Sequence, residues 1–361
     1  MPAENILKFS HELLEEQRKA LFSKKPKEFF EPWLEVSHPF DTEMGSDLLK
    51  NGNVACVILA GGQGTRLEWT GPKALYPIVP EKNITLLQIL LEKVRKASLA
   101  FGQAFEVAIM TSRLSHERFE QHAMEHNFYG LEKEQLVFFP QNVLPLLDEK
   151  GNWFYEKPGQ LALGPDGNGS VFHNLAQTGI LKRWKEKGIQ AVIVLQVDNP
   201  LTEPFDPFIL HELTKNKCDV VAKTIERNDP EEKIGVFAKA NGKLCVVEYS
   251  EVDERSKTAR ALDGKLAWPY ANIGVFAFSM GFVEKMADVH LPWHIAWKKA
   301  HSCDVGEIKC AKCETFIFDV LPLAKDPLLL LYSREKCYAP LKNKEGDKSP
   351  KTVLSKISHL V

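Results

Sequence analysis

The sequence of 361 residues contains no long hydrophobic run. Its longest apolar stretches, residues 54–60 and 328–331, are far shorter than the roughly 20 residues that cross a bilayer. Acidic residues interrupt the first twenty positions, which therefore do not resemble the apolar core of a secretory signal. We expect neither a membrane-spanning segment nor export.

The sequence also has few cysteines and almost no net charge. The seven cysteines are odd in number and scattered, unlike the dense spacing of a disulfide framework, and they predict a reducing compartment, the cytoplasm. Lys and Arg number 46 against 48 Asp and Glu, so the formal net charge is −2 and there is no global positive field. We expect no nucleic-acid or membrane partner, and any anionic ligand must be bound by local groups.

The composition is that of a folded protein with a large core. Hydrophobic residues make up 44% and charged residues 26% of the chain, and no repeat or Gly/Ser-rich linker divides it. Residues 1–50 are predicted to form an N-terminal helical segment, with prolines interrupting it at Pro26 and Pro32. The positions near helical spacing are Leu7, His11, Leu14 and Leu21.

Residues 51–325 have the pattern of an α/β domain. The continuous apolar run at 54–60, closed by Gly61 and Gly62, predicts a buried strand of a parallel sheet. Helices and strands then alternate, which predicts a Rossmann-like core with a mixed, mainly parallel sheet. The predicted helices cover residues 85–99, 117–125, 171–187 and 282–287, and the predicted strands cover 105–110, 136–139, 191–197, 273–278 and 316–318.

A β-rich region is predicted over residues 218–278, inserted in that domain. Short β segments at 220–224, 234–238 and 244–249 carry the signal, with Asn241-Gly242 as a hairpin turn between the last two. Residues 326–361 are predicted to form a short C-terminal segment, with a Lys-rich loop after Pro340.

The segment after the first buried strand carries the clearest chemical signal. Gly61, Gly62 and Gly64 allow backbone N–H groups to approach a phosphate chain, and Arg66 and Lys73 add positive charge. This pattern predicts a polyphosphate site. It is not a Walker A motif, because no Gly-Lys-Ser/Thr ends the loop, and Leu67 replaces the third glycine of the dinucleotide fingerprint. The alternative is a glycine turn that only links a strand to a helix.

Asp198 follows the apolar run 191–197 and precedes Asn199-Pro200, which forces a turn. It therefore lies at the carboxyl end of a predicted strand, where ligands bind in open α/β sheets. A carboxylate there is a candidate Mg²⁺ ligand, and the alternative is an aspartate that caps the turn.

Two further motifs could serve a functional site, but we favour a purely structural role for each. Cys310 and Cys313, with nearby histidines, have part of a zinc-ligand spacing, but a second regular pair is missing, and we expect buried thiols. Lys298 and Lys299 are expected to be an exposed charge pair on a helix.

The glycine-rich segment 59–67 with Pro72-Lys73 resembles the signature of the UDP-sugar pyrophosphorylases, and most of all that of the UDP-N-acetylglucosamine pyrophosphorylases within them. Further segments agree in the same order over about residues 50–345. They are Gln141, Asp166-Gly167-Asn168-Gly169, Gln196-Val197-Asp198-Asn199, Gly235, Val247-Glu248-Tyr249-Ser250-Glu251, Asn272-Ile273, Phe316-Ile317-Phe318-Asp319 and Pro340-Leu341-Lys342-Asn343.

The resemblance implies a uridylyltransferase that joins UTP and a sugar 1-phosphate to give a UDP-sugar and pyrophosphate. It implies catalytic roles for Arg66, Lys73 and Lys342 and a Mg²⁺ ligand at Asp198. It also implies two sets of binding residues. The implied nucleotide-binding residues are Gly61, Gly62, Gly64, Gln141, Gly167 and Asn168. The implied sugar-binding residues are Gly235, Glu248, Tyr249, Asn272 and Phe318, with Phe316 as an alternative to Phe318.

The sequence departs from this family's pattern at three positions, since Glu68, Ala74 and Ser170 stand where a glycine is usual. Glu68 adds a carboxylate near the expected phosphates, where it would repel them unless it points away or is paired. N-acetylglucosamine 1-phosphate is the favoured substrate. The alternatives are glucose 1-phosphate, a non-catalytic sugar-nucleotide binding protein, and, least favoured, a dehydrogenase.

Overall fold

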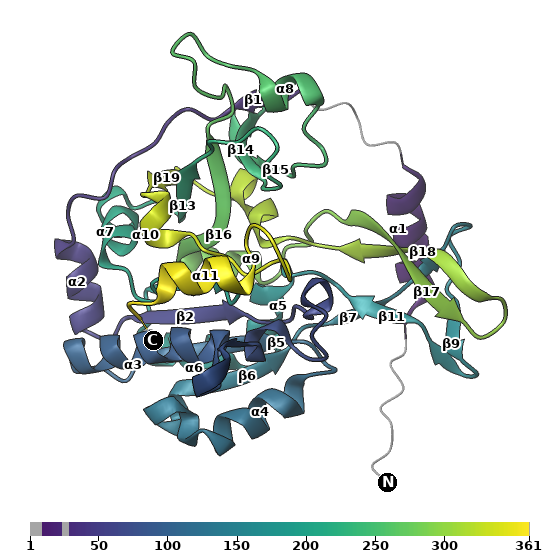
Figure 1. Cartoon of the computed structure of the whole chain (residues 1–361), viewed down its shortest axis with the longest axis horizontal. Helices are drawn as coiled ribbons and strands as arrows, with labels where there is room; N and C mark the ends of the chain where they lie inside the picture. Colours follow the sequence, from purple (N-terminus) through teal and green to yellow (C-terminus); the bar gives the residue numbers. More distant parts are fainter. Residues whose placement is uncertain (1–8, 24–28, 361) are drawn as a thin grey trace.

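A computed structural model describes residues 9–23 and 29–360. Its centre is a mixed sheet, and helices cover both faces (Figure 1). Ten strands of the described residues form this sheet, in the order β1-β14-β16-β12-β2-β5-β6, with β15 beside β14 and with β13 joining β16 to β19. Their bounds are β1 (Glu31–Pro32), β2 (Val54–Leu59), β5 (Glu106–Thr111), β6 (Leu136–Pro140), β12 (Ala191–Gln196), β13 (Val220–Glu226), β14 (Val236–Ala240), β15 (Lys243–Val247), β16 (Tyr270–Ser279) and β19 (Leu328–Leu331).

The sheet has a parallel half and a largely antiparallel half. β12, β2, β5 and β6 pair in parallel, so the loops after β2 and β12 leave the same edge of the sheet. The strands of the predicted β-rich region, β13 to β16, continue this sheet through antiparallel pairs and do not form a sheet of their own. The predicted mixed α/β sheet is therefore confirmed, but it is not mainly parallel as expected, because five of its nine strand pairs in the described residues are antiparallel.

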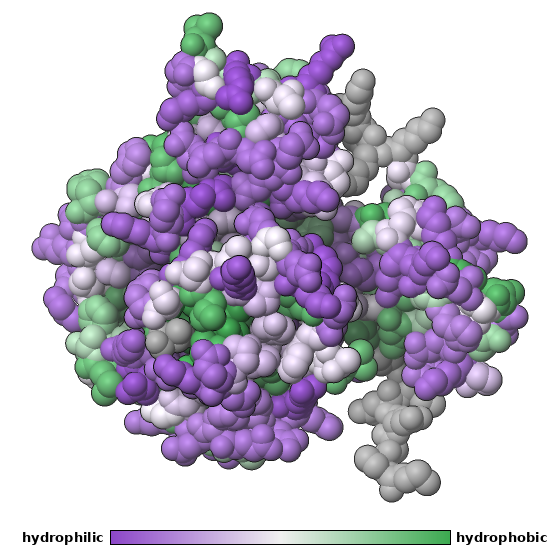
Figure 2. Space-filling model, viewed as in Figure 1, coloured by the Kyte–Doolittle hydropathy of each residue, from purple (hydrophilic) through white to green (hydrophobic). Residues whose placement is uncertain are grey.

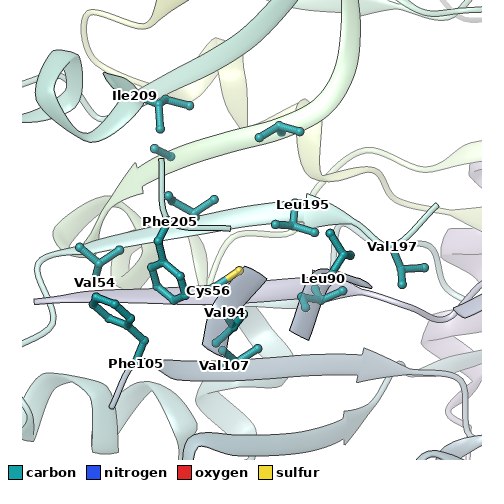
Figure 3. Close-up of a cluster of buried hydrophobic side chains, with 14 of the residues drawn as sticks. Val54, Cys56, Leu90, Val94, Phe105, Val107, Leu195, Val197, Phe205 and Ile209 are labelled. Atoms are coloured by element: carbon teal, nitrogen blue, oxygen red, sulfur yellow. The ribbon is translucent and has the colours of Figure 1, made fainter. Parts of the chain in front are cut away.

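Alternating side chains of β2 explain why both faces are covered. Val54, Cys56 and Ile58 face one apolar layer, and Ala55 and Val57 face the other. Figure 3 shows part of the first layer, where Phe105 stacks on Phe205 at a centroid distance of 4.2 Å. The helices of the first layer are α2 (Glu43–Lys50), α3 (Leu86–Phe101), α4 (His116–Glu125) and α7 (Pro207–Asn216), and those of the second are α5 (Val171–Gln177), α6 (Ile180–Glu186) and α9 (Met280–Met286).

A β-hairpin projects from the core as an arm (Figure 1). It consists of β17 (His294–Ser302) and β18 (Gly306–Glu314), and β18 also pairs with β8 (Leu147–Asp148). The helix α1 (His11–Phe22) packs on this arm, where Leu14 and Leu21 contact a small apolar cluster. The remaining strands are short: β3 (Pro77–Val79), β4 (Ile84–Thr85), β7 (Val143–Pro145), β9 (Tyr155–Lys157), β10 (Gln160–Leu161) and β11 (Leu163–Pro165).

The C-terminal segment returns to the core and packs beside the glycine-rich loop. After α10 (Arg334–Cys337), an irregular stretch leads to α11 (Pro350–Ile357). Leu341 and Ile357 are fully buried in a cluster with Leu67 from that loop. The face shown in Figure 2 is mostly hydrophilic. Within residues 9–23 and 29–360, no helix is long and apolar enough to cross a membrane.

Most predicted helices and strands are present, and three predictions of secondary structure are wrong. The helix predicted over 171–187 is two helices, α5 and α6, because Gly179 between them has a positive φ of 76°. Lys298 and Lys299 lie on the strand β17, not on a helix. The predicted N-terminal helical segment contains the helices α1 and α2, and Pro32 lies in the short strand β1. Leu7 and Pro26 fall outside the described residues.

The strand predicted at residues 316–318 is also absent. Phe316 is extended, but Ile317 begins a 3₁₀ helix, η6 (Ile317–Leu323). The carboxylate of Asp319 accepts a hydrogen bond from the Phe316 N–H at 3.2 Å, which closes the first turn. A side chain three residues ahead therefore takes the backbone donor that a strand would have paired with a neighbour.

Candidate functional site

The loop after β2 folds back on itself as a cradle. The Lys73 N–H donates to the Gly62 carbonyl at 3.0 Å, and the Gly64 N–H donates to the Gly71 carbonyl at 3.2 Å. A Cβ on Gly64 would lie 2.7 Å from the ring of Trp69, so this position needs glycine. Ala74 is fully buried beneath the loop. The loop is therefore a preformed backbone surface beside the end of β2.

Asp198 lies between two lysines that are remote in sequence. Its Oδ2 is 3.5 Å from the Nζ of Lys73, on the glycine-rich loop, and 4.0 Å from the Nζ of Lys342, on the C-terminal segment. The Asp198 side chain is 17% exposed, so these charges interact where solvent screening is incomplete. Two cations around one accessible carboxylate can bind a phosphate group together with a divalent cation.

Arg66 and Lys342 line one cavity of about 580 Å³ beside this group. Lys233, Arg334 and Lys348 contribute further positive charge to its wall, whereas Asp229, Glu231 and Asp347 contribute negative charge. Glu232, which also lines it, is neutralised by ion pairs with Arg334 at 2.6 Å and Lys348 at 3.0 Å. The predicted catalytic residues Arg66, Lys73 and Lys342 are thus brought together around Asp198 and the adjoining cavity.

Gln141 and Gly167 also meet, next to the glycine-rich loop. The Gln141 side-chain amide donates to the Gly167 carbonyl, and its Oε1 lies so close to Gly61 that a Cβ there would approach it to 2.5 Å. Gly167 has a φ of +90°, and a Cβ on it would lie 2.1 Å from the Thr315 carbonyl oxygen. Glycine is therefore required at 167, where a Cβ would meet backbone, whereas a Cβ at 61 would displace the Gln141 amide.

Asn168 has a structural contact in this arrangement. Its Oδ1 accepts a hydrogen bond from the Ile317 N–H at 2.9 Å, and the Gly169 N–H donates to the Thr315 carbonyl at 3.0 Å. These two hydrogen bonds hold the loop that carries Gly167 against the start of η6. Asn168 positions this loop, and its predicted contact with nucleotide stays a prediction.

Asp166 precedes this loop, and its side chain is unusual. The residue is 8% exposed, and its Oδ1 has no hydrogen-bond partner. Burial raises the pKa of this carboxyl to about 7, from an ordinary value of 3.8. The residue that precedes Gly167 therefore carries a buried, titratable carboxyl, a feature that the sequence pattern alone did not reveal.

Three of the predicted sugar-binding residues, Gly235, Glu248 and Asn272, lie at the junction of β14, β15 and β16. The Asn272 N–H donates to the Gly235 carbonyl at 2.9 Å, and the Asn272 Oδ1 accepts from the Gly274 N–H at 2.9 Å. Burial raises the pKa of Glu248, while the nearby ammonium of Lys342 opposes this rise. Glu248 is thus close enough to Lys342 for the two charges to interact.

Aromatic rings form the other side of this region. Phe316 stacks on Phe318 at 5.1 Å, and His294 packs on Phe316 at 4.9 Å. The His294 Nε2 is 3.0 Å from Asp319 Oδ2. Phe318 is 8% exposed, whereas Tyr249 is 40% exposed and lines a separate cavity of about 160 Å³. Sequence reasoning missed the His294–Asp319 pair, because the two residues lie on different elements.

The two cysteines of β18, Cys310 and Cys313, lie in the interior, as expected. Among the described parts of the chain, no group of three or more His, Cys, Asp or Glu side chains is arranged to hold a metal ion. A metal at Asp198 would therefore receive one carboxylate from the protein and its other ligands from phosphates and water. This donor set fits Mg²⁺, which keeps several waters and is bound through few carboxylates.

Comparison with known proteins adds independent information. The family model of UTP–glucose-1-phosphate uridylyltransferase matches residues 17–309. The chain is 34% identical over 345 residues to a Dictyostelium discoideum protein named as a probable UDP-N-acetylglucosamine pyrophosphorylase, covering 88% of this chain and 71% of the relative. It is 33% identical over 335 residues to the UDP-N-acetylglucosamine pyrophosphorylase of Saccharomyces cerevisiae, covering 88% and 70%.

A solved structure gives the same result for the fold. The uridine diphosphate N-acetylglucosamine pyrophosphorylase of Trypanosoma brucei, crystallised with an inhibitor, superposes with a TM-score of 0.83 at 26% identity. The match covers 96% of this chain and 74% of that one. The likeness thus includes nearly all of the present chain.

Proposed function

Because the chain belongs to the UTP–glucose-1-phosphate uridylyltransferase family, we propose that it joins UTP to a sugar 1-phosphate and releases pyrophosphate. N-acetylglucosamine 1-phosphate is the proposed sugar substrate, since relatives covering 88% of the chain are named for UDP-N-acetylglucosamine. The observation that carries the proposal is the position of the Asp198 carboxylate between Lys73 and Lys342, at 3.5 and 4.0 Å.

The proposed reaction is an in-line displacement at the α-phosphorus of UTP. A phosphate oxygen of the sugar 1-phosphate forms a bond to that phosphorus, and the bond to the bridging oxygen of the β-phosphate breaks. The electron pair leaves with pyrophosphate, so atoms and charge balance. Such chemistry depends mainly on positioning and charge neutralisation. Lys73 and Lys342 supply cations at the reacting phosphates, and Arg66 supplies one at the leaving group.

A Mg²⁺ ion bound by Asp198 and phosphate oxygens would neutralise further negative charge on the triphosphate. Gln141 and Gly167 are proposed to contact uracil, because an amide and a backbone group offer both donors and acceptors to the imide edge. Gly235, Glu248, Tyr249, Asn272 and Phe318 are proposed to contact the sugar. A reducing compartment, the cytoplasm, is the proposed location, and the buried thiols of Cys56, Cys310 and Cys313 are compatible with it.

The alternative of a non-catalytic binding protein rested on Glu68 and Ala74. Ala74 is buried away from the loop surface, and the exposed Glu68 carboxylate is neutralised by Lys344 at 2.6 Å. Neither side chain opposes phosphate binding in this arrangement. We therefore favour a catalyst over a binding protein.

The test is pyrophosphate release from UTP with a panel of sugar 1-phosphates, in the presence and absence of Mg²⁺. We expect the highest kcat/KM with N-acetylglucosamine 1-phosphate. Lys73→Ala should lower kcat by about 100-fold or more, because it removes a charge at the reacting phosphates. Lys82→Ala is the matched control, since this lysine is exposed and lies outside the site. Equal activity of Lys73→Ala and Lys82→Ala would contradict the assigned role, and preferred use of glucose 1-phosphate would change the substrate.

A further inference from the structure

The C-terminal segment that carries Lys342 is attached to the turn that carries Asp198. Three hydrogen bonds join alternate residues of that segment to Asp198 and Asn199. The Asn199 Nδ2 donates to the Cys337 carbonyl at 2.8 Å, and its Oδ1 accepts from the Ala339 N–H at 3.0 Å. The Leu341 N–H donates to the Asp198 carbonyl at 2.8 Å.

This attachment depends on the chemistry of one side chain. An Asn amide holds a donor and an acceptor in one plane, so it can bond a carbonyl and an N–H two residues apart, as a neighbouring strand would. Asn199 is 1% exposed, and its hydrogen bonds lie in the interior, where water cannot replace them. Removal of the amide leaves the Cys337 carbonyl and the Ala339 N–H without their partner.

We propose that Asn199 is a positioning residue that holds Lys342 at the reacting phosphates. The side chain acts through the backbone of residues 337–341 and does not itself touch substrate. Asn199 follows Asp198 directly, so the turn that carries the carboxylate also anchors the segment that carries the second lysine. The proposal rests on the proposed function for its kinetic consequence, and on geometry alone for the position of the segment.

The rest of the segment is held independently, so an Asn199 variant should fold. Leu341 is fully buried against Val353 and Ile357. The Lys342 N–H also bonds the Lys348 carbonyl at 2.8 Å. Loss of the Asn199 amide should therefore loosen the stretch before Lys342 without detaching the C-terminal helix α11.

A double-mutant cycle tests the kinetic link. Lys342→Ala should lower kcat by about 100-fold and Asn199→Ala by about tenfold. The double variant should be no slower than Lys342→Ala alone, because Asn199 has no effect once the lysine is absent. Gln17→Ala is the matched control. Gln17 is a fully buried amide that bonds the Pro145 carbonyl at 2.9 Å and Trp153 at 2.7 Å, and it should lose stability with kcat unchanged.

A second measurement needs no activity. Trypsin cleavage after Lys336, which is exposed and directly precedes Cys337, should rise about fivefold or more in Asn199→Ala relative to cleavage after Lys309 on the arm, and stay constant in Gln17→Ala. If the purified wild type releases no pyrophosphate, the proposed function fails, but the cleavage ratio still tests the attachment. Multiplicative kinetic losses in the cycle, or an unchanged cleavage ratio, would overturn the role of Asn199.

Discussion

The carboxylate of Glu68 receives a hydrogen bond from the Nζ of Lys344 at 2.6 Å, across the edge of the candidate site. Glu68 ends the 3₁₀ turn of the glycine-rich loop with a left-handed φ of 52°, a conformation that favours glycine. Both side chains are exposed, and the bond raises the pKa of Lys344. The extra carboxylate of the loop is thus paired with the C-terminal segment and does not stand alone near phosphate.

Removal of Lys344 should weaken nucleotide binding, and removal of Glu68 should strengthen it. Lys344→Ala leaves an unpaired negative charge beside the loop, and we expect the KM for UTP to rise roughly two- to fivefold at low salt. Glu68→Ala should lower this KM, and the double variant should lie near the wild type. Both effects should shrink as salt rises, because exposed charges are screened. Steady-state kinetics at two ionic strengths is the measurement, and single variants that move KM in the same direction would exclude the charge explanation.

Gly61 is expected to control the position of Gln141. Alanine at 61 would place its Cβ 2.5 Å from Gln141 Oε1, which forces the amide to move. We expect the KM for UTP to rise about tenfold, equivalent to about 1.4 kcal/mol, and the preference for UTP over CTP to fall. Gly281→Ala is the control, since nothing lies within 4 Å of a Cβ there. An unchanged preference for UTP would separate Gln141 from base recognition.

Local sequence signals predicted the elements whose partners are close in the chain. The β2 strand and the glycines after it form one continuous pattern, and Asp198 follows its strand directly. By contrast, the apolar residues 316–318 suited a strand as well as a buried 3₁₀ turn, and the contact of Asp319 with the Phe316 N–H decided between them. Periodicity alone does not resolve such short segments.

The candidate site was predictable mainly through the family resemblance, because its parts come from distant positions. Asp198 and Lys342 are neighbours in space only through the return of the C-terminal segment. Asn199 looked like a turn residue before Pro200, since its partners Cys337 and Ala339 lie 138 and 140 residues away. No local pattern encodes such long-range hydrogen bonds. Asp166 was likewise only part of a motif until its burial was visible.

The carboxylate of Asp198 should be needed for metal dependence and not for folding. Asp198→Asn replaces a charged oxygen ligand by a neutral one, so kcat should fall about 100-fold and half-maximal activity should need at least about tenfold more Mg²⁺. Without metal, the variant should bind UTP as tightly as the wild type or more tightly, because a negative charge beside Lys73 is gone. Titration calorimetry with and without Mg²⁺ measures this. Wild-type Mg²⁺ dependence in the variant would remove Asp198 from the metal site.

Burial of Asp166 should make stability depend on pH. The folded chain keeps the proton of this carboxyl up to about pH 7, whereas an unfolded chain releases it near 3.8. Stability of the wild type should therefore fall as the pH rises between these values, at up to about 1.4 kcal/mol per pH unit. Asp166→Asn cannot ionise. Its stability relative to the wild type should increase by about 2–3 kcal/mol between pH 5 and pH 8, as measured by urea unfolding.

Asp253→Asn provides the control for this titration. Hydrogen bonds from Ser256 hold the pKa of Asp253 below its usual value, so its carboxylate stays ionised throughout pH 5–8 in both folded and unfolded chains. Any stability difference of this variant should therefore be constant over that range. A constant difference for Asp166→Asn as well would mean that the Asp166 carboxyl is already ionised at pH 5.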